Sequence, residues 1–302
     1  MKQAFREQRI TPKRAAQITL VNDILEEYAA EGYRLTLRQI YYQHVARGII
    51  ENKKSEYNKV MKTLEIGRYN GLIDWDMIED RTRIPRLDYF VASIQNALED
   101  TVEYFKYDRQ KGQPYHMEIW TEKDAVSGIL ARVASSYHIK LLIDRGYISH
   151  STIYRSYKKI LAETMVFAEA NAGRVSRILY VGDHDPSGLD MPRDIEEKLK
   201  GFGLTDDDFK IIHVAVTRKQ VERYRLPENP AKITDPRARK YIVEHGRSSW
   251  EVDALKPKVL HKIVDDAVMD YLDLERFNKM VQKEEKDKKK LKRMVKKIIE
   301  EL

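Results

Sequence analysis

Three acidic residues follow two predicted strands, where a parallel sheet presents side chains to a ligand. Glu122 comes directly after the strand predicted over residues 116–121, and Asp183 and Asp185 follow the one over residues 177–182. Functional groups collect at the carboxyl ends of strands in open parallel sheets. Converging carboxylates repel one another unless a hard cation such as Mg²⁺ neutralises them, and such a cation stabilises charge on a phosphoryl group. The sequence therefore predicts a magnesium site at Glu122, Asp183 and Asp185.

The same residues also have a purely structural interpretation. Asp183 and Asp185 can cap the helix predicted over residues 189–200, and Glu122 can be an ordinary surface residue. His184, between the two aspartates, should point away from them by strand alternation. Two acidic strand ends in one α/β unit favour the metal site over this alternative.

The apolar spacing predicts the elements that position these residues. Strands over residues 116–121, 139–144, 177–182 and 209–216 alternate with helices over residues 124–136, 151–172 and 189–200. Strands that alternate with helices indicate an α/β unit with a mostly parallel sheet.

The first third of the chain has a different pattern. Helices over residues 12–30, 37–47 and 56–68, with Thr11, Thr36 and Ser55 as caps, precede a short hairpin predicted over residues 72–80. Three helices and a small β wing are typical of a winged helix-turn-helix, although an ordinary helical bundle fits the same spacing. Lys59, Lys62 and Arg68, on the third helix, are candidates for contacts to nucleic acid.

The acidic segments resemble the Toprim domain of topoisomerases, primases and some nucleases. Residues 122–125 (Glu-Lys-Asp-Ala) and 182–188 (Gly-Asp-His-Asp-Pro-Ser-Gly) are most similar to the A subunit of DNA topoisomerase VI and the related meiotic double-strand-break protein. The resemblance implies Mg²⁺ bound by the three carboxylates. It also implies a winged-helix domain with a nucleophilic tyrosine before the Toprim domain.

A matching tyrosine motif is present at the expected place. Residues 38–42 read Arg-Gln-Ile-Tyr-Tyr, where the family has Arg-[Asp/Glu]-x-[Tyr/Phe]-Tyr, so Gln39 departs from the pattern and leaves tyrosine activation open. The resemblance implies that Tyr42 is the nucleophile, whose attack on a phosphodiester would leave a reversible phosphotyrosyl link. Arg38, one helical turn earlier, can bind the phosphate or the developing phenolate. Packing is the alternative role for Tyr41 and Tyr42.

These patterns divide the chain into four parts. We expect an α/β (overall α+β) protein with a winged-helix domain over residues 1–84 and a connecting helix and linker over residues 85–114. A Toprim domain would follow over residues 115–275, and a basic amphipathic helix over residues 276–302. Within the Toprim part, residues 248–263 read as a capped amphipathic helix and resemble a segment of the same family.

Composition narrows the classes of function. The 302 residues carry a net charge of +7, and residues 276–302 alone hold eleven Lys and Arg against five Asp and Glu, so the chain has a basic tail and a more acidic middle. The absence of cysteine excludes disulfides, thiolate metal sites and a cysteine nucleophile. No P-loop, dinucleotide or serine-hydrolase motif is present. No signal peptide or membrane span is recognisable, so we expect a soluble, intracellular protein of the cytoplasm or nucleoid.

The resemblance implies an Mg²⁺-dependent DNA strand-breaking transesterase, similar to the cleavage and rejoining subunit of a type IIB topoisomerase. It further implies double-stranded DNA as substrate and a homodimer in which the tyrosine of one subunit meets the metal of the other. The sequence leaves open whether a separate ATPase subunit of the B type is a partner. The alternatives are a Toprim nuclease that uses activated water and a non-catalytic DNA-binding protein.

Overall fold

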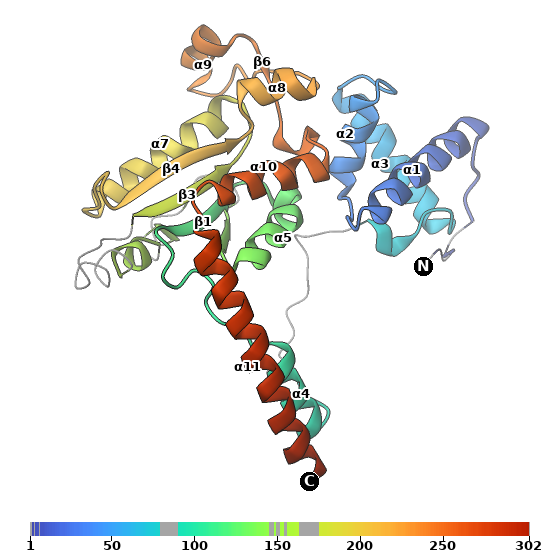
Figure 1. Cartoon of the computed structure of the whole chain (residues 1–302). Coiled ribbons are helices and arrows are strands. Elements are labelled where there is room, and N and C mark those ends of the chain that lie inside the picture. Colours follow the sequence, from blue (N-terminus) through green and yellow to red (C-terminus); the bar gives the residue numbers. More distant parts are fainter. Residues whose placement is uncertain are drawn as a thin grey trace.

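The computed structural model describes residues 2, 4–5, 7–78, 90–144, 148, 152–153, 156–162 and 175–301. Figure 1 shows three N-terminal helices, an α/β part built on a parallel sheet, and a pair of helices that projects from it. The predicted mixed α/β class with a parallel sheet is therefore confirmed.

The N-terminal helices α1 (Pro12–Ala30), α2 (Leu37–Ala46) and α3 (Lys54–Tyr69) pack around one apolar core. Their spacing places one apolar stripe of each helix inward, as expected for amphipathic helices. The fully or nearly fully buried side chains of this core include Val21, Ile24, Leu25, Leu35, Ile40, Val60 and Leu64.

The caps of these helices fix where they begin. Thr11 accepts a hydrogen bond from the amide of Arg14 at the start of α1, as predicted. Thr36 and Gln39 form a reciprocal capping box at the start of α2. Helix α3 begins one residue before Ser55, so Lys53 stands at the N-cap and the predicted Ser55 cap is wrong.

The hairpin predicted over residues 72–80 is wrong for residues 72–78, and residues 79 and 80 lie outside the described chain. Trp75–Met77 forms a short 3₁₀ helix, η1, because Asp74 accepts a hydrogen bond of 2.8 Å from the amide of Asp76. Ile78 makes a single parallel bridge to Leu35. A capped turn thus stands where the first strand of a hairpin would be required.

The sheet contains four parallel strands in the order β2-β1-β3-β4. Their bounds are His116–Thr121 for β1, Lys140–Ile143 for β2, Ser176–Val181 for β3 and Phe209–Ala215 for β4. Because the strands run in one direction, their carboxyl ends share one edge of the sheet. Glu122 and Asp183 follow at that edge, as the sequence predicts.

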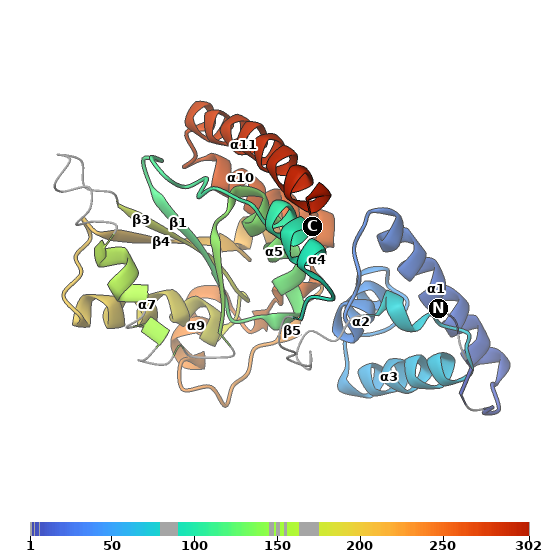
Figure 2. The ribbon, with the colours of Figure 1, turned by 90° about the horizontal axis from the view of Figure 1, so that it is seen from below.

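Helices cover both faces of the sheet (Figures 1 and 2). One face packs against α5 (Ser127–Tyr137), which continues from the short η2 (Asp124–Val126), and against α10 (Pro257–Met269). The other face packs against α7 (Pro186–Gly201). Of the helix predicted over residues 151–172, the described residues 152–153 and 156–162 are helical, and the rest lies outside the described chain.

A separate two-stranded antiparallel sheet and two short helices follow β4 in the sequence. Helices α8 (Arg218–Tyr224) and α9 (Ala238–His245) flank strand β5 (Asn229–Pro230), which pairs with β6 (Ser248–Ser249). The single capped helix predicted over residues 248–263 is wrong: β6 is followed by η3 (Val252–Ala254), and α10 begins only at Pro257. The reason is that Trp250 exchanges two backbone hydrogen bonds with His184, which holds this segment extended.

Helices α4 (Ile94–Glu103) and α11 (Leu274–Glu300) lie side by side and point away from the sheet (Figure 1). Residues 104–113 attach the base of the pair: Arg109 forms an ion pair of 2.6 Å with Glu284, and Gln113 and Asp273 exchange two hydrogen bonds. We call α4 and α11 the helical arm. Among the described helices, none is long and apolar enough to cross a membrane.

A buried charge lies in the middle of the sheet. Glu118 has no exposed surface and accepts hydrogen bonds from Trp120 at 2.8 Å, Lys140 at 3.0 Å and His116 at 3.2 Å. Burial by itself raises the pKa of this carboxyl, but the hydrogen bond from His116 and the charge of Lys140 outweigh it and hold the pKa below its usual value. Glu118 is therefore ionised, and its ion pair with Lys140 connects β1 to β2.

Candidate functional site

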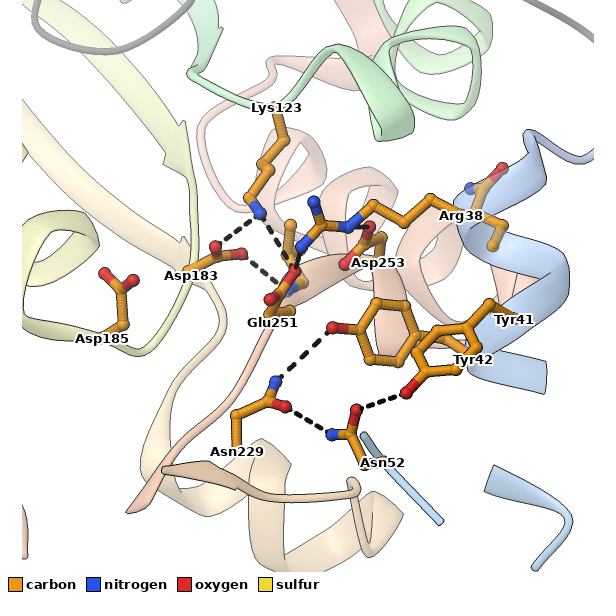
Figure 3. A network of polar contacts seen from close by, with 12 residues as sticks. Arg38, Tyr41, Tyr42, Asn52, Lys123, Asp183, Asp185, Asn229, Glu251 and Asp253 are labelled. Atoms are coloured by element: carbon orange, nitrogen blue, oxygen red, sulfur yellow. Dashed lines mark hydrogen bonds and ion pairs between the residues drawn. The ribbon is translucent and has the colours of Figure 1, made fainter. Parts of the chain in front are cut away.

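Side chains from four distant parts of the sequence meet beside the carboxyl ends of β1 and β3 (Figure 3). Helix α2 contributes Arg38 and Tyr42, and the segment after β1 contributes Lys123. Asp183 follows β3, and Glu251 lies between β6 and η3. The N-terminal helices and the α/β part thus share one network of polar contacts.

Lys123 lies at the centre of this network. Its ammonium nitrogen is 2.6 Å from Asp183 Oδ2 and 3.2 Å from Glu251 Oε2, and the amide of Val252 donates to Asp183 Oδ1 at 2.9 Å. Burial raises the pKa of Asp183; Lys123 opposes this, and the charges of Glu251 and Asp253 add to it. Asp183 is therefore a buried carboxyl that depends on a cation for its charge.

Arg38 reaches the network from the other side. Its Nε is 2.9 Å from Asp253 Oδ2, and its guanidinium also forms an ion pair with Glu251. The Asp253 side chain has no exposed surface, and burial raises its pKa although Lys123 and Arg38 oppose the shift. Burial also raises the pKa of Glu251, but the charges of Lys123 and Arg38 outweigh it and lower that pKa to about 2. Three carboxylates therefore compete for two cations.

Tyr42 is buried beside this network and is 4% exposed. Asn229 Nδ2 is 3.5 Å from its hydroxyl oxygen, and the carboxylates of Glu251 and Asp253 lie close enough to act on it electrostatically. Burial raises the pKa of the phenol, and the charges of Glu251 and Asp253 raise it further. In this arrangement Tyr42 is a neutral, enclosed phenol with the Arg38 guanidinium 5.8 Å from its ring centre.

The neighbouring tyrosine has different partners. Tyr41 donates its hydroxyl to Asn52 at 2.9 Å, and its ring lies edge-on to that of Tyr42 at 5.2 Å. Gln39, where the resembling family has an acidic residue, is 2% exposed and accepts a hydrogen bond of 2.9 Å from the amide of Thr36. Position 39 therefore serves the helix cap in this arrangement and does not contact the Tyr42 hydroxyl.

The two aspartates predicted to act together have separate roles. Asp185 caps α7 with Oδ1, which accepts from the amide of Gly188 at 2.7 Å and from the hydroxyl of Ser187 at 3.0 Å. Its Oδ2 lies 3.9 Å from the largely exposed Lys232. The structural interpretation of the sequence thus holds for one oxygen of Asp185, whereas Asp183 pairs with Lys123.

Glu122 carries a charge that its surroundings compensate poorly. Burial raises the pKa of its carboxyl; Lys123 opposes the shift, and the negative charge of Asp185 adds to it. In the described part of the chain, no three His, Cys, Asp or Glu side chains are grouped closely enough to hold a metal ion. Glu122 and Asp185 nevertheless fit Mg²⁺, which commonly takes one or two carboxylates and completes its shell with water and phosphate oxygens.

His184 and the basic residues of α3 lie outside this network. His184 Nδ1 is 3.1 Å from the Tyr241 hydroxyl, away from the two aspartates, as strand alternation predicts. Lys59 and Lys62 are exposed and form ion pairs with glutamates of their own helix. The Arg68 guanidinium stacks 4.2 Å above the Trp75 ring.

Sequence reasoning missed four members of the network. Lys123 is part of the segment that resembles the Toprim domain, but the sequence assigned it no role. Glu251 and Asp253 were expected in a helix, and Asn229 was not among the candidates. The available signal was the pair of acidic residues two positions apart, Glu251 and Asp253, which repeats the spacing of Asp183 and Asp185.

No protein-family model matches the sequence, and no curated protein matches it. What bears on function is therefore the chemistry of this network. Two cations, a tyrosine and several buried carboxylates at one sheet edge form a site that can bind a phosphate and hold a hard cation.

Gly188→Ala is expected to lower the free energy of unfolding by about 1–3 kcal/mol. A Cβ atom at this position would lie 2.3 Å from the backbone oxygen of Asp183, so the turn that carries both aspartates would have to shift. Urea denaturation checks this. Gly201→Ala, in the same helix, is the control because its Cβ would meet nothing within 4 Å. Equal midpoints for the two variants would contradict the tight turn.

Proposed function

We propose that this protein is a DNA strand-breaking transesterase that resembles the A subunit of topoisomerase VI, with a three-helix N-terminal part in the place of the winged helix and a Toprim-like α/β part. Tyr42 attacks a DNA phosphodiester: its oxygen forms a bond to phosphorus, the bond from phosphorus to one sugar oxygen breaks, and the phenolic proton is passed on to that leaving oxygen. The product is a phosphotyrosyl link that the sugar hydroxyl can reverse.

One observation carries the proposal. Tyr42 and Arg38 share a polar network with Lys123 and Asp183 although they are far apart in the sequence (Figure 3). A tyrosine with only a packing role has no need of a hydroxyl placed next to Asn229 and among the charges of Glu251, Asp253 and Arg38.

The roles of the other residues follow from their charges. A DNA phosphate is an anion that can replace Glu251 as the partner of Arg38 and share Lys123, so both cations hold the phosphate against the tyrosine. Glu122 and Asp185 would hold Mg²⁺. When bound, Mg²⁺ neutralises charge that develops on the phosphate and the leaving oxygen.

The site described above is closed. Because Tyr42 is 4% exposed and Glu251 occupies both Arg38 and Lys123, DNA must displace Glu251 or move α2 away from the sheet edge before attack. The resemblance implies that Tyr42 acts on the metal site of a second subunit, and an opened α2 is free to do so. The closed arrangement then represents the resting state of each chain.

A metal-dependent nuclease is the second candidate. The observation that favours it is the raised pKa of the enclosed Tyr42 phenol, which makes the tyrosine a poor nucleophile in the closed arrangement. In that case a water activated at Glu122 and Asp185 attacks the phosphate, and Tyr42 has a positioning role. We propose double-stranded DNA as the substrate of both the transesterase and the nuclease, and a place inside the cell for either enzyme. Both proposals are compatible with the presence or absence of a separate ATPase partner.

The two candidates are separated by trapping the reaction. The full chain is incubated with Mg²⁺ and end-labelled double-stranded DNA and then denatured with detergent. The transesterase gives labelled DNA covalently attached to the protein, and chelation of Mg²⁺ with EDTA abolishes the adduct. Cut DNA without an adduct identifies the nuclease, and binding without cutting leaves a non-catalytic DNA-binding protein.

A further inference from the structure

The helical arm has no core of its own. None of the ten residues of α4 is buried, although its apolar residues follow a helical stripe. Large apolar side chains are exposed on both helices, among them Ile94 on α4 and Met294 and Ile298 on α11, and Tyr104 at the C-cap of α4 is exposed as well. Two helices alone cannot bury an apolar stripe, so we expect further helices to cover this surface.

A groove runs along the line where α4 meets α11. It has a volume of about 1000 Å³, and Val102, Val295 and Ile299 contribute its apolar lining. On α11 the lining residues of the groove fall between positions 285 and 300, the half of the helix that points away from the sheet (Figure 1). The groove is therefore accessible to an elongated partner without interference from the body of the protein.

The two rims of the groove carry opposite charges. Helix α4 has three acidic residues and no basic one, and Glu99 and Glu103 lie on its rim. Helix α11 has eleven basic and five acidic residues, and its side of the groove carries four lysines, Lys292 and Lys296 among them, against Glu285 and Glu300, so that this rim is basic on balance. A two-fold rotation places an acidic rim against a basic rim twice, so the surface is complementary to itself.

We propose that the arms of two copies of this chain pack groove to groove, forming a four-helix bundle that joins two protomers. Each α4 then lies against the α11 of the other copy, the apolar lining becomes the bundle core, and the charged rims form the border. This interface lies apart from Tyr42 and Lys123 and requires neither the tyrosine chemistry nor a metal. It gives a dimer through the arms, whatever reaction the sheet edge performs.

The mass of the full chain in solution tests the interface. Sedimentation equilibrium of the wild type is expected to give about twice the 35.6 kDa of one chain. Lys292→Glu/Lys296→Glu is expected to raise the dimer dissociation constant about tenfold or more, because each acidic rim then faces another. Lys286→Glu/Lys290→Glu is the matched control: it makes the same charge change on α11 but outside this groove, and the dimer should persist.

A second variant distinguishes pairing between copies from damage to one arm. Glu99→Lys/Glu103→Lys should weaken its own dimer in the same way. Mixed with Lys292→Glu/Lys296→Glu, it should restore a dimer, because in the mixed pair both contacts again join opposite charges. A monomeric wild type, a dimer insensitive to both variants, or no restoration on mixing would overturn the proposal. A monomer whose DNA affinity depends on Lys292 and Lys296 would instead assign the groove to DNA.

Discussion

Tyr42→Phe should reduce the covalent protein–DNA adduct by at least about a thousandfold, since removal of the nucleophile of a covalent mechanism costs this much or more. The substitution removes one hydroxyl and keeps the ring, which contacts Tyr41 and lies 5.8 Å from the Arg38 guanidinium. The measurement is the fraction of labelled DNA retained with denatured protein at fixed Mg²⁺.

Tyr41→Phe is the matched control for this experiment. It removes the same atom from the neighbouring residue of the same helix, where the hydroxyl donates to Asn52 and reaches Tyr42 only through Asn52 and Asn229. We expect a loss of about 1 kcal/mol in stability and an unchanged adduct. Equal adduct levels for wild type and Tyr42→Phe would show that Tyr42 is not the nucleophile.

Glu118→Ala should lower the free energy of unfolding by about 3–5 kcal/mol, which is the cost of breaking a buried ion pair by removing one partner. Lys140 would lose a carboxylate 3.0 Å away, and the ring nitrogens of Trp120 and His116 would lose their acceptor inside the sheet. Urea denaturation at pH 7 measures the effect. Glu275→Ala is the control because that residue is 78% exposed and should change stability by less than about 0.5 kcal/mol.

The contribution of Glu118 to the free energy of unfolding should depend on pH in a defined direction. The folded protein holds the pKa of Glu118 below its usual value. The stabilising effect of the Glu118 carboxylate is therefore fully present above the unfolded pKa of about 4.3. It is lost as the pH falls through the lower pKa of the folded protein. The stability gap between wild type and Glu118→Ala should therefore narrow on acidification below about pH 4. A constant gap, or one that widens, would contradict an ionised Glu118.

The sheet edge could be predicted from the sequence because it depends on local patterns. Strand alternation and the acidic residues after each strand place Glu122 and Asp183 at one edge of a parallel sheet, and the structure has that edge. The caps at Thr11 and Thr36 are equally local, since each depends on residues within one helical turn.

The partners of these residues could not be predicted in the same way. The ion pairs from Arg38 to Glu251 and Asp253 span more than 200 positions, and no local rule fixes which distant residues fill a sheet edge. The Asp-x-Asp motif formed by Asp183 and Asp185 does not show that its two members have different partners. Asp185 caps α7, whereas Asp183 forms an ion pair with Lys123. The segment after Ser248 was misread because its pairing with His184, not its helical periodicity, decides its conformation.

The central claim is that Tyr42 becomes covalently attached to DNA, and mass spectrometry of the trapped adduct tests it most directly. Nuclease treatment trims the attached DNA to a short nucleotide, and trypsin cleaves after Arg38 and Arg47, so residues 39–47 form one peptide with both Tyr41 and Tyr42. We predict that this peptide carries the nucleotide mass and that fragmentation places it on Tyr42. A nucleotide on Tyr41 or on another peptide, or cut DNA with this peptide unmodified, would contradict the claim.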